Sequence, residues 1–265
     1  MSDTATTRTP RLLTIPISHY CEKARWALDR AGIPYAEERH LQGVHRIAAR
    51  WAGGGTTVPV LVTDSRAIGE SHDILVWVDA RSPSELRLFP AEPVARREVE
   101  DACRRLDAEL GPAGRRLMYV HMLAQRSLAL EYNNQGVPRW EAVAMRRGWP
   151  AARRFMNHAL AITPGVEKRD EAVVLAELDH VAELISDGRP YLCGERFGAA
   201  DLTFAALAAA VLVPSGYGVT LPQPEAMRAD TAALVRRMRE HPAGCYAMSL
   251  YERHRRETPS PASLR

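Results

Sequence analysis

The sequence predicts a chain of two domains, a mixed α/β domain followed by an all-helical domain. Three observations lead to this prediction. Strand and helix signals alternate at the start of the chain, a turn-rich segment follows, and nearly everything beyond it has helical periodicity. A length of 265 residues is typical of one or two domains. We expect the first domain at residues 11–82, a linker at 83–94 and the helical domain at 95–256.

The α/β domain is expected to begin with a β-strand and a helix. Residues 11–17 form a short β-like run, and residues 19–31 place their apolar side chains at helical spacing. Gly32 follows at a position that favours helix termination, and Pro34 prevents the helix from continuing.

Short strands, a loop and a second helix complete the predicted α/β domain. We expect strands at 33–37, 58–62 and 67–68, a loop with one helical turn at 40–57, and a helix at 70–80. This order predicts a mixed four-stranded sheet covered by helices.

The rest of the chain is expected to be helical. Turn residues and prolines gather in the linker. Thr163 and Pro164 resemble the N-cap and first residue of a helix. The expected helices are at 98–110, 163–186, 197–213, 225–240 and 243–255, with a loop at 214–224 and a fraying Pro/Ser-rich tail.

Composition points away from several classes of function. The net charge is +3, so neither nucleic acid nor an anionic membrane is an expected partner. The start of the chain lacks the apolar core of a secretory signal, and the longest apolar stretch, at 202–214, is shorter than the roughly 20 residues of a membrane span. The four cysteines form no CxxC pair, which indicates a reducing, cytoplasmic setting without a metal site.

The first motif lies where the first strand meets the first helix, at Ser18, His19, Tyr20 and Cys21. Free backbone N–H groups and the helix dipole favour an anion at this helix terminus. The Ser18 hydroxyl is suited to donate a hydrogen bond to a thiolate there, or it serves only as an N-cap. The two roles are compatible.

Two further motifs could bind an extended peptide with a charged end. Pro59 opens an apolar strand, and a cis Val58–Pro59 bond would leave the Val58 backbone free to pair with a ligand, although most X–Pro bonds are trans. Ser71 opens the next helix and could bind a carboxylate, while Glu70 could pair with an ammonium group. An ordinary helix cap with a first-turn acid explains the second motif equally well.

A fourth motif concerns folding. Asp201 is placed to reach back to the helix cap at Gly198, and Phe197 and Leu202 have the spacing of a hydrophobic staple.

Together, in this order, the motifs resemble the glutathione S-transferase family, of the soluble bacterial type with serine at the active-site turn. ISHYCEKARWALDRAGIPYAEE resembles its first strand, turn and helix, TTVPVLV its cis-proline strand, GESHDILVWVD its Glu-Ser helix start, and FGAADLTFAAL its helical-domain cap. The resemblance is good over 11–90, weaker over 190–255, and at 100–165 limited to helical character. It implies a thioredoxin-like domain followed by an all-helical one, a cytoplasmic homodimer, and glutathione as co-substrate without a metal.

The resemblance also implies roles for individual residues. Ser18 matches the catalytic residue that contacts the glutathione sulfur. Val58 matches the backbone that pairs with the cysteinyl part, with Pro59 as the cis-proline. Glu70 and Ser71 match the groups that hold the γ-glutamyl end.

The chain departs from the family pattern in two places. Gly198 replaces the usual Ser or Thr cap, at a cost of a few tenths of a kcal/mol. Ser18 and Cys21 form an S-x-x-C arrangement that resembles a redox C-x-x-C without its first cysteine. Cys21 is either a buried structural thiol or a nucleophile, and His45 or Arg46 is a candidate for the glycyl carboxylate.

The resemblance predicts an enzyme that binds glutathione as a thiolate and conjugates it to a small hydrophobic electrophile. Lowering a thiol pKa by about two units takes about 2.7 kcal/mol, which a hydrogen bond to a charged group, at roughly 1.5–3 kcal/mol, and the helix terminus, at roughly 0.3–1 kcal/mol, supply together. Two alternatives stay open, a glutathione-dependent thiol reductase that uses Cys21 and a non-catalytic binding protein. His19 and Tyr20 are secondary site candidates. Candidate walls of the electrophile pocket are Tyr119, Met122, Tyr132 and Trp140.

Overall fold

The computed structural model describes residues 8–255. The predicted fraying of the C-terminal tail and residue 256 of the predicted helical domain lie outside the described residues, as do residues 1–7. Within the described range, no helix is both long enough and apolar enough to cross a membrane.

Four short strands form one mixed sheet, as the sequence predicts. Their order across the sheet is β2-β1-β3-β4. β1 pairs with β2 in parallel and with β3 antiparallel, and β3 pairs antiparallel with β4. The strands are β1 (Arg11–Thr14), β2 (Ala36–Arg39), β3 (Val60–Val62) and β4 (Ala67–Ile68).

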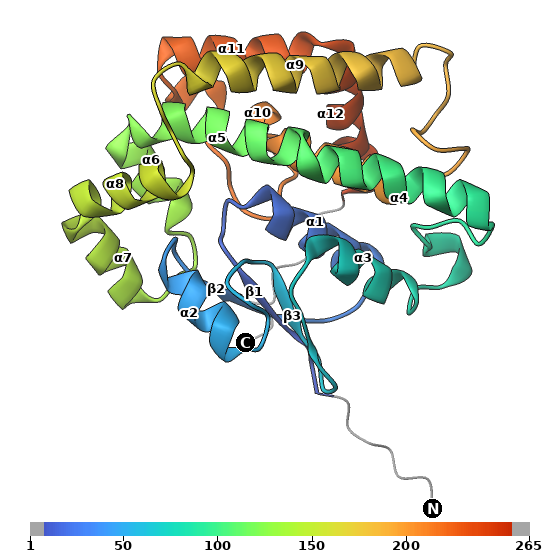
Figure 1. The fold of residues 1–265 in the computed structure, drawn as a ribbon, viewed down its shortest axis with the longest axis horizontal. Coiled ribbons are helices and arrows are strands. Elements are labelled where there is room, and N and C mark those ends of the chain that lie inside the picture. The colour runs from blue at the N-terminus through green and yellow to red at the C-terminus, as the bar shows by residue number, and fades with distance from the viewer. Residues whose placement is uncertain (1–7, 256–265) are drawn as a thin grey trace, which may run out of the picture.

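Helices cover both faces of this sheet. Successive side chains of its strands point to opposite faces, so apolar residues on each face are buried against helices. Leu12 and Leu61 belong to the large core that contains α1 (His19–Arg30) and α3 (Ser71–Asp79). Their neighbours on the other face pack against α2 (Val44–Trp51). In Figure 1, α1 and α3 lie between the sheet and the helical part of the chain.

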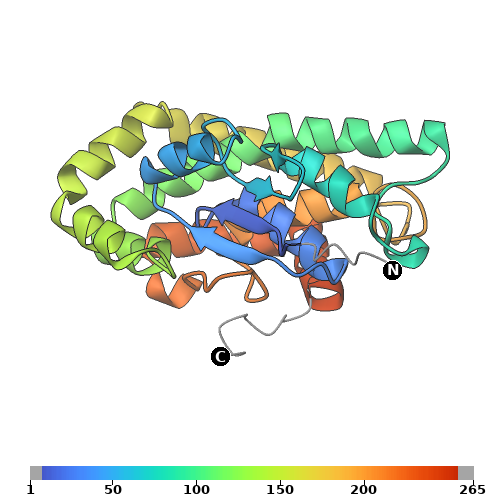
Figure 2. The same cartoon turned by 90° about the horizontal axis from the view of Figure 1, so that it is seen from below.

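The helical part is built around α10 (Ala199–Leu212), which is buried along nearly its whole length. Its many alanines let α1, α4, α5 and α12 pack closely around it. Figures 1 and 2 show α6 to α8 as a separate arm at one side of the molecule. The other helices are α4 (Pro93–Ala108), α5 (Leu110–Leu123), α6 (Arg126–Asn133), α7 (Arg139–Arg147), α8 (Trp149–Ala159), α9 (Val166–Leu184), α11 (Ala229–Glu240) and α12 (Pro242–His254), with 3₁₀ turns η1 (Ser84–Leu86) and η2 (Pro224–Ala226).

The predicted cap of α10 is confirmed. The Asp201 carboxylate accepts a hydrogen bond from the Gly198 backbone N–H at 2.9 Å. It also accepts hydrogen bonds from the Leu192 N–H and the Tyr246 hydroxyl. Asp201 therefore joins the start of α10 to the preceding loop and to α12.

The structure corrects two element boundaries in the α/β domain. β2 occupies 36–39 rather than 33–37, because the Ile33 N–H closes the end of α1 on the Leu28 carbonyl and Pro34 has no N–H to donate. The segment expected to be a loop with one helical turn contains an eight-residue helix, α2, whose buried Ala49 packs on the sheet.

Three helix starts in the helical part also differ from the prediction. α11 begins at Ala229 rather than at 225, because Pro224–Ala226 form the 3₁₀ turn η2. α4 begins at Pro93, inside the predicted linker, because the Glu92 carboxylate caps it by accepting from the N–H groups of Val94 and Ala95. α9 begins at Val166 after Gly165, whose φ of 82° favours glycine, and Thr163 is not its N-cap. The predicted domain boundaries stay a prediction.

Candidate functional site

The turn between β1 and α1 presents the Ser18 hydroxyl at the start of a helix. Ser18 has an extended backbone, and its Oγ accepts a hydrogen bond from the Cys21 N–H at 3.4 Å. Its own N–H donates to the Ile15 carbonyl at 3.1 Å, which tightens the turn. The predicted N-cap role is therefore confirmed, and the side chain is half-buried rather than enclosed.

His19 and Tyr20 leave this turn in different environments. His19 is buried, and burial together with the Arg115 charge lowers its pKa to about 3. The ring is therefore neutral at neutral pH, and its Nε2 has no hydrogen-bond partner among residues 8–255. Tyr20 donates its hydroxyl to the Asp107 carbonyl at 2.8 Å, which ties the turn to α4, and burial raises its pKa to about 12.

The Cys21 side chain lies inside the protein. It is fully buried, and burial raises its pKa despite the nearby Arg25 charge and Ser18 hydrogen bond. A reactive thiol needs an exposed sulfur and a lowered pKa. Neither condition is met in this structure.

The Val58–Pro59 peptide bond is cis, which the sequence leaves open. Pro59 is buried and Val58 is half-buried just before β3. Among the described residues, neither the N–H nor the carbonyl of Val58 has a backbone hydrogen-bond partner. This stretch of backbone is therefore free to pair with an extended ligand.

Glu70 and Ser71 lie at the start of α3. Glu70 takes the N-cap position without a side-chain cap bond and is exposed, whereas Ser71 is buried as the first helical residue. Gly69 before them has no room for a side chain, because a Cβ there would lie 2.5 Å from the Gly54 carbonyl oxygen. Glu70 is close enough to Tyr20 for its charge to raise the pKa of that hydroxyl.

The sheet register brings these three segments to one edge. Leu13 of β1 pairs with Val60 of β3, so the Ser18 turn follows β1 at the end where Val58 enters β3. Leu61 pairs with Ile68, so β4 leads into Glu70 at the same end. The strands thus gather the predicted glutathione-binding segments, although they are far apart in the sequence.

The loop after β2 lies at this edge too, but it is held by the helical part. Both oxygens of Glu141 accept hydrogen bonds there, at 2.8 Å, from the His40 ring and the Leu41 N–H. Gln42 exchanges hydrogen bonds with the Asn133 side chain and donates to the Tyr119 hydroxyl.

The two candidates for the glycyl carboxylate follow this loop in α2. His45 accepts a hydrogen bond from the Gly43 N–H at 3.1 Å, and burial lowers its pKa. Its ring therefore serves the local turn and is neutral at neutral pH. Arg46 forms no ion pair within residues 8–255 and stays a candidate.

An apolar cavity opens beside the Ser18 turn, with a volume of about 80 Å³. Its walls come from the turn itself, from α5, α6, α8 and α10, and from the loop after α10. Three of the four predicted wall residues line it, namely Tyr119, Met122 and Tyr132. Trp140 does not, because it lies on α7 with 62% of its surface exposed.

Comparison with known proteins agrees with this geometry. Residues 12–86 match the family model of the glutathione S-transferase N-terminal domain. No protein with a curated description matches the chain in sequence. Solved glutathione S-transferases superpose on almost the whole chain, one from Pseudomonas fluorescens with a TM-score of 0.59 and 18% identity over 95% of this chain and 98% of that one. The chain has the glutathione S-transferase fold.

Two other structures show the range of proteins that share this fold. A glutathione S-transferase from Methylobacillus flagellatus, solved with glutathione bound, has a TM-score of 0.59 and 14% identity and covers 91% of this chain and 93% of its own. The beta-etherase LigF from Sphingobium has a TM-score of 0.56 and 19% identity and covers 91% of this chain and 99% of its own. At these identities the likeness establishes the fold, thioredoxin-like and then helical, and leaves the reaction open.

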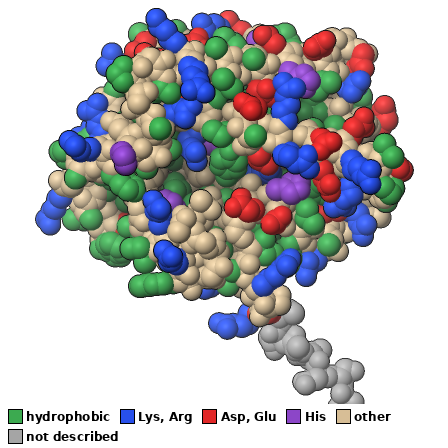
Figure 3. Space-filling model, viewed as in Figure 1, with side chains coloured by type: hydrophobic (Ala, Val, Ile, Leu, Met, Phe, Trp, Pro, Cys, Tyr) green, Lys and Arg blue, Asp and Glu red, His purple; other side chains and the backbone are tan. Residues whose placement is uncertain are grey.

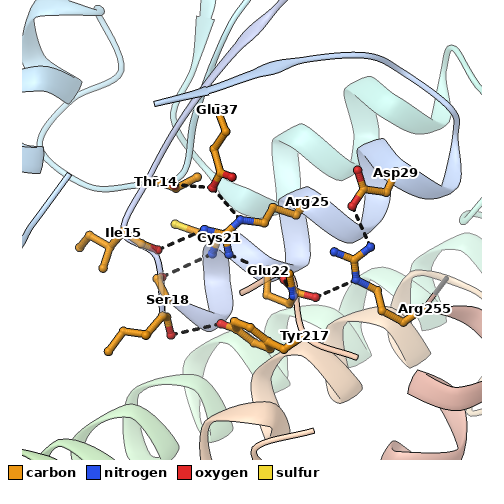
Figure 4. Close-up of polar contacts among 12 residues, drawn as sticks. Thr14, Ile15, Ser18, Cys21, Glu22, Arg25, Asp29, Glu37, Tyr217 and Arg255 are labelled. Atoms are coloured by element: carbon orange, nitrogen blue, oxygen red, sulfur yellow. Dashed lines mark hydrogen bonds and ion pairs between the residues drawn. The ribbon is translucent and has the colours of Figure 1, made fainter. Parts of the chain in front are cut away.

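In this glutathione S-transferase fold, a buried network of charges supports the Ser18 turn from behind (Figure 4). Arg25 pairs with Glu37 at 2.7 Å, and Glu22 pairs with Arg255 at 2.8 Å. Burial alone would raise the pKa of Glu37, but Arg25, followed by Arg39, lowers it to about 2.

The same network fixes the loop that closes the cavity. The Gly218 N–H donates to the Glu22 carboxylate at 3.0 Å, and the Tyr217 hydroxyl donates to the Ile17 carbonyl at 3.1 Å. Tyr217 lines the cavity beside Ile17. The wall and the turn are therefore held in one arrangement by charges that the cavity does not contact.

Sequence reasoning missed most of the cavity wall. Arg115 and Met118 line it from α5 together with the predicted Tyr119 and Met122, and the i, i+3, i+4 and i+7 spacing of the four was the available signal. Periodicity identifies such a face but does not say whether it meets a core or a cavity.

The surface charge and the arrangement of metal-ligating side chains bear on other kinds of ligand. Figure 3 shows acidic and basic side chains intermixed over the face seen in Figure 1. Within residues 8–255, no group of three or more His, Cys, Asp and Glu side chains is arranged to hold a metal ion.

Proposed function

We propose that this chain is a glutathione transferase that holds glutathione at the sheet edge and conjugates it to a small electrophile in the adjoining cavity. The observation that carries the proposal is the meeting of Ser18, Val58 and the Glu70–Ser71 pair at one edge, next to an apolar cavity. Ligand sites commonly combine an apolar cavity with a few convergent polar groups.

Each part of the edge suits one part of glutathione. The Ser18 hydroxyl and the first N–H groups of α1 would stabilise the thiolate. The unpaired Val58 backbone would bind the cysteinyl unit as an added strand. Glu70 and Ser71 would bind the ammonium and carboxylate of the γ-glutamyl end. We further propose a cytoplasmic homodimer, as the resemblance implies.

Burial favours this mechanism over thiol reduction by Cys21. Its sulfur is fully enclosed and burial raises its pKa, so it is poorly placed to attack a disulfide. Replacement of Cys21 by alanine should leave conjugation activity within a few fold of wild type. Loss of all turnover in C21A, with the fold intact by circular dichroism, would instead support the reductase.

Titration calorimetry with reduced glutathione, in reducing buffer near neutral pH, tests the site itself. Wild type should bind, and Glu70→Gln and Ser71→Ala should each weaken binding by roughly tenfold, the loss expected for one charge-assisted hydrogen bond. Glu85→Gln, which removes an exposed carboxylate elsewhere in the same region, is the matched control. Absence of binding at high millimolar glutathione would refute the proposal and favour a non-catalytic relative.

A further inference from the structure

One cation in the cavity wall lacks a partner. Arg115 on α5 lines the cavity, and it forms no ion pair and no hydrogen bond with any of residues 8–255. Its Nε is buried without a hydrogen-bond partner. The next residue, Arg116, instead makes two hydrogen bonds of 2.6 Å to the Asp170 carboxylate. The chain therefore pairs one of two adjacent arginines and leaves the one in the cavity free.

Nothing else in the cavity wall compensates this charge. The lining residues include no aspartate or glutamate. His19, the other titratable nitrogen-bearing group in the wall, is neutral at neutral pH, and its buried Nε2 also lacks a partner. Burial of unpaired polar groups is unfavourable, so a ligand that supplied an acceptor would be favoured over an apolar one.

Apart from Gln42, Asn133 and the tyrosine hydroxyls, the rest of the wall is apolar and adaptable. Met118, Met122 and Met156 contribute flexible side chains to it, and Trp149 and Tyr132 contribute aromatic surface. The Arg115 guanidinium lies 5.9 Å from the centre of the Tyr20 ring, on the side of the turn where α5 begins. If Arg115 held the anionic group of a ligand, the rest of that ligand would lie along the apolar wall, beside Ser18.

From this arrangement we propose that the electrophile of this transferase carries an anionic group, such as a carboxylate on an aromatic body, and that Arg115 binds that group. This inference rests on the proposed function and names its substrate class. In the reaction, the glutathione sulfur forms a bond to the electrophilic carbon, the leaving group departs with the electron pair of the broken bond, and the thiol proton passes to solvent. Arg115 takes no part in bond making.

The test compares two electrophiles that differ in charge. para-(Chloromethyl)benzoate and para-(chloromethyl)benzamide have nearly the same shape, and both release chloride when a thiolate attacks. Conjugation rates at saturating glutathione are measured for wild type, Arg115→Gln and Arg115→Lys, each divided by the uncatalysed rate. Arg153→Gln, on the exposed side of α8, makes the same charge change outside the cavity.

The proposal expects wild type to prefer the benzoate, and R115Q to lower kcat/KM for the benzoate by about tenfold to a hundredfold while sparing the benzamide. R115K should retain part of the preference, and R153Q should match wild type. Equal activity on both compounds, unchanged in R115Q, would overturn the inference while the transferase stands. Equal losses on both with a raised KM for glutathione would also overturn it, because Arg115 would then act on glutathione.

A binding measurement keeps the inference testable if the chain conjugates nothing. Calorimetric titration with para-toluate and para-toluamide requires no glutathione. Tighter binding of para-toluate, lost in R115Q and not in R153Q, would support an anion site in a cavity that is not a transferase site. Equal binding of the two probes, or no binding of either, would overturn it.

Discussion

The charged and polar groups on the two sides of helix α1 differ in whether they have partners. On the inner side, Glu22 and Arg25 are buried, and each has a partner of opposite charge within 4 Å (Figure 4). On the side of the cavity, His19 and Arg115 have buried nitrogen atoms without hydrogen-bond partners and form no ion pair among residues 8–255, whereas the one inner-side nitrogen without a hydrogen bond, Nη1 of Arg25, still lies 3.7 Å from the Glu22 carboxylate. Paired charges restrict the structure to one arrangement, whereas unpaired polar groups leave interactions for a ligand to supply. The difference separates the side of α1 that supports the fold from the side that we propose binds a ligand.

The largest loss of stability should come from removing a buried ion pair on the inner side of α1. Arg25→Met removes the partner of Glu37, and loss of one member of a buried pair costs about 3–5 kcal/mol. We expect the low end, about 3 kcal/mol, because Glu37 keeps Arg39 and Glu22 keeps Arg255. Urea unfolding measures the change.

The exposed pair of Arg11 and Glu38 provides the control for that experiment. Both side chains are more than a third exposed, so Arg11→Met should cost no more than about 1 kcal/mol. If R25M costs no more than R11M, the buried network does not stabilise the fold and the proposed division of α1 is wrong.

The buried His19 on the cavity side should make the stability of the fold depend on pH. Burial and Arg115 depress the His19 pKa to about 3 in the folded state, against an ordinary value near 6.5. Between these values the unfolded chain binds a proton that the folded chain does not, so stability falls as pH drops below 6.5. His19 alone should account for a loss of about 2.7 kcal/mol at pH 4.5, and His19→Asn should remove that share, while His254, whose pKa burial also lowers, keeps its own.

The test compares how the unfolding free energy changes with pH, so a loss of stability caused by the substitution itself does not matter. A lower stability of H19N at every pH does not affect the result, because only the change in unfolding free energy between pH 7 and 4.5 is compared. His158→Asn on the exposed side of α8 is the matched control. A wild-type slope in H19N would show that His19 titrates alike in both states.

The fold was predictable from sequence where local signals and tertiary packing agree. Gly32 ends α1 with a φ of 64°, and α3 begins at Ser71, both within a residue or two of prediction. The extent of α2 was underestimated although Val44, Ile47, Ala48 and Trp51 recur at helical spacing, and this apolar stripe does not face the core, because Ile47 and Trp51 are exposed and Ala49 alone is buried.

For the site, motifs predicted the segments but not the environments of their side chains. Burial raises the pKa of Cys21, and among the charges that act on its thiol is Glu37, which lies far away in the sequence. The free state of Arg115 likewise depends on which acids fold toward α5, and Asp170 reaches Arg116 instead. Spacing along one chain does not encode such choices, because they arise only when the helices pack.

The smallest effect on stability should come from substitutions of Ser18. They distinguish the helix-capping role of this residue from a role of its hydroxyl in conjugation. Loss of the capping oxygen costs about 1 kcal/mol when alanine replaces serine but only a few tenths when glycine does, because glycine is itself accepted at N-caps. Ser18→Ala and Ser18→Gly should therefore differ in urea unfolding. Both remove the hydroxyl, so both should lower kcat/KM for conjugation by roughly tenfold to a hundredfold, the value of one hydrogen bond to a thiolate. If S18G instead keeps wild-type turnover while S18A loses it, activity follows the integrity of α1, and Ser18 acts through the helix end rather than through its hydroxyl.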